Sequence, residues 1–126
     1  MKPRDLLTQL SAGRIALGAT LLAKPALATS MWVGRDGERP GGEVLARALG
    51  ARDAAIGGGT LAAMRSGQPL RPWVLAGLFS DATDLLATHA ARHQLPRAAA
   101  PLIYALAGGA LVAGAANLAT RDDAPA

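Results

Sequence analysis

The chain has 126 residues, the size of a single domain. Hydrophobic residues make up 51% of it and aromatic residues only 3%, and 15 residues are glycine, a composition that favours helices packed in lipid through close backbone contact. Its 13 basic residues are scattered singly, which argues against a nucleic-acid partner and is typical of helix ends at a lipid bilayer, and the absence of cysteine excludes disulfides and thiolate chemistry.

Four apolar helical stretches are expected in chain order, separated by proline, glycine and charged residues. They cover residues 6–31, 43–64, 70–89 and 97–119. The first is expected to end near Lys24-Pro25 or a little beyond. The polar segment 34–42 that follows it is typical of a loop, and the fourth stretch precedes the charged tail Arg121-Asp122-Asp123.

The fourth stretch is the only one that meets a strict test for a transmembrane span. Residues 98–120 are 23 residues without a formal charge, enough for a hydrocarbon core about 30 Å thick. The other three are long enough but are interrupted by charged side chains, at Arg14, at Arg47, Arg52 and Asp53, and at Asp81 and Asp84. We therefore expect one all-α domain over residues 1–126, an integral bundle of about four transmembrane helices in the plasma membrane.

Both termini of such a bundle lie on one side of the membrane. Its orientation stays open, because the basic residues divide evenly between the two sides and the positive-inside rule cannot decide.

Small residues recur at every fourth position in two of the stretches, a spacing that favours close helix contact. They are Ala51, Ala55, Gly59 and Ala63 in the second stretch, and Ala105, Gly109 and Ala113 in the fourth. Trp32 and Trp73 fall at the end of one stretch and the start of another, where interfacial aromatic residues belong. Both features favour a membrane bundle.

The charged residues inside the stretches are predicted to meet at one depth. At about 1.5 Å of rise per residue, Arg52 lies roughly 12 Å, and Asp81 and Asp84 roughly 9 to 14 Å, from one side of the hydrocarbon core. Asp81 and Asp84 share a helix face, being three residues apart. Arg14 lies roughly 18 Å from the same side, and its long side chain can reach this layer.

The predicted cluster is therefore Arg14 and Arg52 against Asp53, Asp81 and Asp84. One interpretation makes it a set of buried ion pairs that fix how the helices align. The other starts from the count of two positive and three negative groups. The excess carboxylate then carries a proton or meets a cation or substrate, as in a proton relay or a polar-ligand site.

The sequence gives little indication of metal binding, phosphate binding or catalysis. His89 and His93 are spaced as one face of a metal site, yet no third ligand is near in sequence, so we expect polar residues at the membrane surface and no metal. The glycines around Gly58 lack the lysine of a phosphate-binding loop, and no serine lies in a nucleophile elbow. We expect no catalytic residues, no cofactor and no enzyme activity.

Two alternatives remain open. Basic Lys2 and Arg4, an apolar run at residues 15–23 and the motif Ala26-Leu27-Ala28 imitate the three parts of a secretory signal peptide, whose removal after Ala28 would leave three helices. A soluble helical bundle is the other alternative.

The stretch Gly50-Ala51-Arg52-Asp53, followed by Gly57, a turn at Gly67 and an apolar helix with Asp81 and Asp84, resembles a bacterial family. It is similar to short four-helix membrane proteins described as a domain of unknown function, distantly DoxX-like. The resemblance covers about residues 13–119, but not the pattern of segment 34–42. It implies a four-helix membrane bundle and no established activity, cofactor or catalytic residue.

The leading hypothesis for function is a structural or accessory membrane protein that associates with itself or with a larger complex through its small-residue faces. The alternative is a small proton-coupled or polar-ligand transporter or binding protein that uses the Arg and Asp cluster.

Overall fold

All regular secondary structure in the described part of the chain is helical, which confirms the all-α prediction. The structure, a computed structural model, describes residues 2–122; the side chains of residues 121 and 122, and Asp123 of the expected tail, lie outside that description. The elements are α1 (Pro3–Ala23), α2 (Pro25–Val33), the 3-10 helix η1 (Gly34–Glu38), α3 (Pro40–Ser66), α4 (Arg71–Ala91) and α5 (Ala99–Asp122).

The continuous helix expected over residues 6–31 is instead two helices. Pro25 has no backbone N–H and its ring disfavours a helical Lys24, whose φ of -137° and ψ of 69° end α1. α2 then lies across one end of the molecule, and it ends at Gly34, whose φ of +67° suits glycine. Segment 34–42, expected as a loop, forms η1 and the first turn of α3.

The other three helices begin and end within a few residues of their expected limits. Pro40 occupies the first turn of α3, where its missing N–H costs no hydrogen bond. Gly67 closes α3 in the left-handed conformation, and the N–H of Gln68 donates back to the carbonyl of Ala63 at 3.0 Å.

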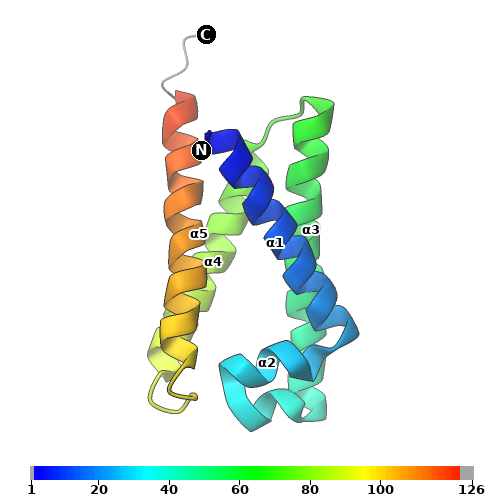
Figure 1. The fold of residues 1–126 in the computed structure, drawn as a ribbon, viewed down its shortest axis with the longest axis vertical. Helices are drawn as coiled ribbons and strands as arrows, with labels where there is room; N and C mark the ends of the chain where they lie inside the picture. The colour runs from blue at the N-terminus through cyan, green and yellow to red at the C-terminus, as the bar shows by residue number, and fades with distance from the viewer. Residues whose placement is uncertain (1, 123–126) are drawn as a thin grey trace.

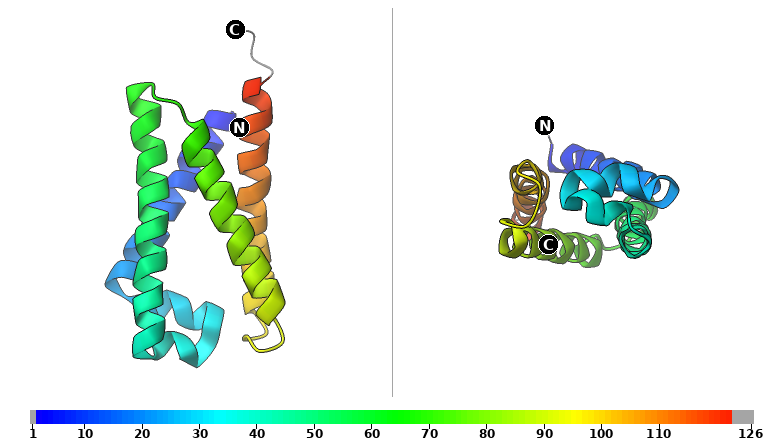
Figure 2. Two further views of the ribbon diagram at one scale, coloured as in Figure 1. Left: turned by 180° about the vertical axis from the view of Figure 1, so that it is seen from behind. Right: turned by 90° about the horizontal axis from the view of Figure 1, so that it is seen from below.

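The long helices form two pairs. α1 packs mainly against α3, and α4 packs mainly against α5, with fewer contacts between the pairs. The pairs lie close together where α1 begins and diverge toward the opposite end, where α2 and η1 occupy part of the space between them (Figures 1 and 2). α1 begins and α5 ends at the same end of the molecule, as expected for a bundle with both termini on one side.

The α1–α3 pair depends on close backbone contact at Gly18 and Gly50. A Cβ atom added to Gly50 would lie 2.7 Å from the carbonyl oxygen of Gly18, so only glycine fits here without a shift of one helix. The predicted stripe on this helix is displaced, because Ala51 and Ala55 are exposed. The buried face of α3 instead contains Ala46, Gly50, Asp53, Ile56, Gly57, Thr60 and Ala63.

The predicted stripe on α5 likewise lies outside the packed face. Ala105 and Gly109 are exposed and Ala113 is half-buried, whereas Ile103 and Ala107 are buried. The apolar core lies at the end where the pairs meet, and consists of Leu7, Ala63, Leu70 and Val74, with Met64, Trp73, Leu78 and Leu118 packed against it.

Among residues 2–122, two helices are long and apolar enough to cross a membrane: α1, and α5 over Ala99–Thr120. Only 22% of the apolar window of each is buried, which is low for the core helix of a soluble protein. α1 also lies near the N-terminus, as a signal sequence does. The structure thus supports membrane association through length and composition.

Gly50→Ala should lower the free energy of unfolding by about 1–3 kcal/mol, because the new methyl group overlaps the α1 backbone. The matched control is Gly58→Ala on the same helix, where an added Cβ meets nothing within 4 Å. This control should raise stability by up to about 1 kcal/mol through helix propensity. Denaturant titration of the protein in detergent micelles, followed by circular dichroism, measures both; equal stabilities would contradict the glycine contact.

Candidate functional site

The five charged residues expected to meet come from the middle of three helices. Arg14 lies on α1, Arg52 and Asp53 lie on α3, and Asp81 and Asp84 lie on α4. The structure brings them into one continuous set of ion pairs, which we call the charge network. The prediction that opposite charges from separate helices pair with one another is confirmed.

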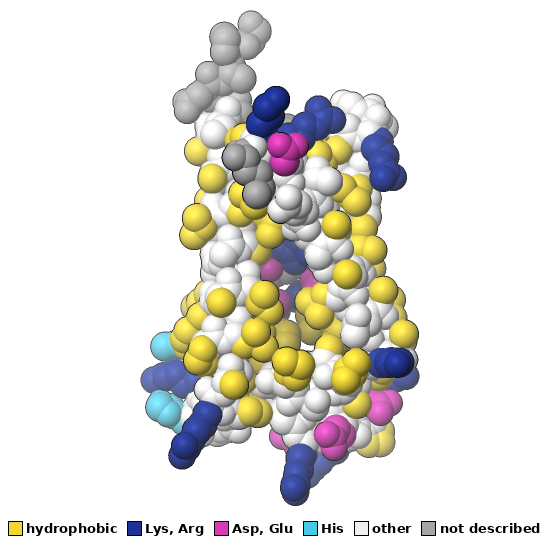
Figure 3. All heavy atoms as spheres, in the orientation of Figure 1, with side chains coloured by type: hydrophobic (Ala, Val, Ile, Leu, Met, Phe, Trp, Pro, Cys, Tyr) yellow, Lys and Arg dark blue, Asp and Glu magenta, His cyan; other side chains and the backbone are white. Residues whose placement is uncertain are grey.

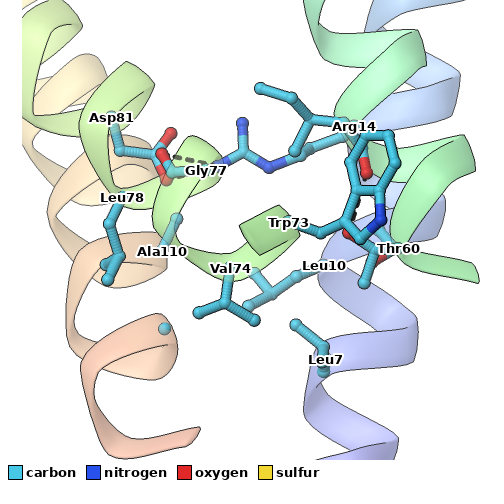
Figure 4. Close-up of a pocket in the computed structure, with 13 residues that line it drawn as sticks. Leu7, Leu10, Arg14, Thr60, Trp73, Val74, Gly77, Leu78, Asp81 and Ala110 are labelled. Atoms are coloured by element: carbon cyan, nitrogen blue, oxygen red, sulfur yellow. Dashed lines mark hydrogen bonds and ion pairs between the residues drawn. The ribbon is translucent and has the colours of Figure 1, made fainter. Parts of the chain in front are cut away.

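Arg14 links all three helices. Its Nη1 donates to Asp53 Oδ1 at 3.3 Å, and its Nη2 donates to Asp81 Oδ2 and, at 3.4 Å, to the carbonyl of Gly77. Figure 4 shows the Arg14 guanidinium facing the Asp81 carboxylate, with Gly77 beside them. One guanidinium therefore contacts two carboxylates and a backbone carbonyl, which satisfies a cation that lies mostly out of solvent.

Arg52 forms the second centre of the network. Its Nη1 and Nη2 donate to the two carboxylate oxygens of Asp84 at 3.0 and 2.7 Å, a bidentate geometry that fixes both side chains. Its Nε and Nη2 also donate to Asp53 Oδ1 at 3.3 and 3.2 Å. Asp53 thus connects the two arginines.

Two carboxylate oxygens of the network remain without a partner among residues 2–122. The hydrogen bonds to Asp53 all end on Oδ1, and the hydrogen bond to Asp81 ends on Oδ2. The side chains of Asp53 and Asp81 are only 5% and 9% exposed, yet Asp53 Oδ2 and Asp81 Oδ1 are not sealed from solvent. Each can still accept a hydrogen bond.

A cavity of about 570 Å³ lies against the charge network, between the two helix pairs. Its wall includes Arg14, Asp53, Asp81 and Asp84, together with Gln9 and Trp32. The rest of the wall is apolar and includes Leu10, Leu17, Leu21, Leu49, Leu102 and Ile103. A volume of this size and a mostly apolar wall with a few polar groups are typical of a site for a small organic molecule.

The cavity opens through the side of the molecule. On the face shown in Figure 3, charged side chains are visible through an opening between α1 and α5, above α2, and hydrophobic side chains surround it. Leu17 of α1, Met31 of α2 and Leu106 of α5 line the cavity and are also exposed, so they form part of its rim.

Trp32 holds α2 at the end of the cavity. Its Nε1 donates to Thr88 Oγ1 of α4 at 2.9 Å, which ties α2 to the second helix pair. On the other side of Arg14 lies a pocket of about 30 Å³, large enough for a water molecule (Figure 4). Arg14 and Asp81 line both spaces, and their ion pair therefore lies between them.

The two histidines lie apart from the network. His89 Nδ1 is 2.6 Å from the Tyr104 hydroxyl, a contact between α4 and α5. In the described part of the chain, no group of three His, Cys, Asp or Glu side chains is placed to hold a metal ion.

No family model, curated protein or solved structure matches this chain. The described part of the chain therefore defines only a class, an all-helical protein in which two helices have the length and apolar composition to cross a membrane.

The sequence predicts the charge network but not the cavity beside it. Gln9 and Trp32 were not expected in its wall, although Gln9 is a conspicuous polar residue in an apolar helix. Trp32 was interpreted as an interfacial residue, and only the turn at Pro25 directs it inward.

A double-mutant cycle of Arg52→Gln and Asp84→Asn should give a coupling energy of about 1–3 kcal/mol. The coupling is strong because the ion pair is bidentate and mostly buried. The matched control is the exposed pair Glu43 and Arg47, also on α3. The cycle of Glu43→Gln and Arg47→Gln should give a coupling energy below about 0.5 kcal/mol. Unfolding in mixed micelles measures both cycles. Equal coupling energies would show that the charge network adds no more than a surface ion pair.

Proposed function

We propose that this chain is a multi-pass protein of the plasma membrane that binds a small, mainly apolar molecule in its cavity. The observation that supports this most directly is the placement of a cavity of about 570 Å³ against the charge network. A purely structural set of ion pairs needs no such space beside it, because well-packed interiors leave few voids larger than a water molecule.

In this proposal α1, α3, α4 and α5 span the bilayer. α1 and α5 are apolar enough by themselves. α3 and α4, with 27 and 21 residues, have the length for a core of about 30 Å, and their central charges are compensated by the network. α2 lies across one end, at the level expected for the membrane surface.

The surface supports the same placement. In Figure 3 the basic side chains gather toward the two ends of the molecule, and hydrophobic side chains cover much of the region between them. Large hydrophobic side chains are exposed on every long helix, for example Leu22, Val44, Phe79 and Val112. Basic ends and an apolar middle match lipid headgroups and hydrocarbon.

The lateral opening gives access to the cavity from the bilayer, so in this proposal the ligand enters from the lipid. Its apolar rim faces the region assigned to hydrocarbon, so a molecule dissolved in lipid can enter without crossing water. The apolar wall receives the body of such a molecule, and the charge network receives its polar group.

A second candidate is the accessory role expected from the sequence, in which small-residue faces bind another copy or a larger complex. The outward position of Ala105 and Gly109 favours it, since an added Cβ at Gly109 meets nothing within 4 Å. If this face is an interface, Gly109→Leu should reduce the oligomeric state in nanodiscs. An unchanged monomer in both proteins would count against it. Membership of the DoxX-like group stays a prediction.

Binding can be tested by equilibrium dialysis of three rigid probes, 1-adamantanol, 1-aminoadamantane and 1-adamantanecarboxylate, against the full chain in phosphatidylcholine nanodiscs. Empty nanodiscs provide the correction for partitioning into lipid. At least one probe should bind saturably, and Ala107→Phe should weaken its binding at least tenfold, because the new ring fills the cavity from α5.

The matched control is Ala115→Phe, an exposed position on the same helix that is not part of the cavity wall. It should bind as the wild type does. Absence of saturable binding by all three probes, or equal binding by the two phenylalanine variants, would refute the proposed function.

A further inference from the structure

The polar group of the cavity's occupant can be inferred from the charges of the wall. We infer that the site selects a molecule whose polar end is an organic ammonium group attached to an apolar body. This inference rests on the proposed function and adds the chemical class of the ligand.

The cavity wall carries an excess of negative charge. It includes three carboxylates, from Asp53, Asp81 and Asp84, and one guanidinium, from Arg14. Among the described residues no other Asp, Glu, Lys or Arg side chain lines the cavity, and Arg52 is not part of the wall. Even with Arg52 counted, the network has one more acid than base.

Hydrogen-bond geometry indicates the same type of ligand. Asp53 Oδ2 and Asp81 Oδ1 have no donor among residues 2–122, whereas the guanidiniums of Arg14 and Arg52 already donate to carboxylates. The network therefore offers a ligand free hydrogen-bond acceptors but few free hydrogen-bond donors. An ammonium group supplies N–H donors and a positive charge together, and an anionic group would meet carboxylates instead.

The rest of the wall determines what carries the ammonium. No group of three potential ligand side chains in the described part of the chain could hold a metal ion, which disfavours a bare divalent cation. The wall away from the network is mostly leucine and isoleucine, and the rim is apolar. A fully hydrated cation would leave that surface uncovered, whereas an amphipathic amine covers it.

The three adamantane probes test this inference, because they share one apolar body and differ in the charge of one group. In phosphatidylcholine nanodiscs at neutral pH, 1-aminoadamantane should bind wild-type protein at least tenfold more tightly than 1-adamantanol, and 1-adamantanecarboxylate should bind most weakly. Asp81→Asn should remove most of the preference for the amine over 1-adamantanol, because the wall then has one carboxylate fewer. The control Asp36→Asn, at an exposed site on η1, should leave the preference unchanged.

Failure of the inference can be distinguished from failure of the proposed function. If the alcohol or the carboxylate binds as tightly as the amine, and Ala107→Phe still blocks binding, the cavity is a ligand site but its excess charge is neutralised by a proton, and the inference is overturned. An amine preference that survives both Asp81→Asn and Asp53→Asn also overturns it. If Asp81→Asn does not fold, the probe series on wild-type protein and on Asp53→Asn decides.

Discussion

The arrangement of the helices depends on the ion pairs of Arg14 and Arg52. Each arginine belongs to the α1–α3 pair and contacts an aspartate of α4, in the other pair. Because direct contacts between the pairs are few, these bonds are a main connection across the molecule. Removing either arginine would leave an aspartate of α4 largely buried without its counter-ion, which is strongly destabilising.

Packing is dense on one side of the charge network and open on the other. Toward the end where α1 begins, the pairs converge on a core around Leu70 and Val74. Beyond the network they diverge, and α2, tied to α4 through Trp32 and Thr88, lies with η1 across part of the space between them. The cavity is thus bounded by polar contacts at the network and at Trp32, and by leucine side chains between.

The two proposed roles use different surfaces of one scaffold. Ligand binding depends on the inward face of α5, where Ala107 lines the cavity, and on the acids of α3 and α4. Association with a partner depends on the outward face of α5 at Ala105 and Gly109. The roles are compatible, since a helix that binds a partner outside can still line a cavity inside. What distinguishes them is whether the charge network is in contact with a ligand.

The sequence by itself determined the helical class, most helix limits and the pairing of the charges. Helix limits follow from local residues such as Pro40 and Gly67, and the pairing follows because charges on apolar helices must be compensated at matching depth. The sequence could not identify which face of each helix makes the contacts, because alanine and glycine occur all around α3 and any of several stripes could pack. The tertiary structure selected the one through Gly50.

Only the tertiary structure decided that the network borders a cavity. That depends on the angle between the two helix pairs and on the turn at Pro25 that carries Trp32 inward, and neither is encoded in a local pattern. Charge compensation is a requirement on individual helices that a sequence can reveal, whereas empty space arises from how all the helices pack together.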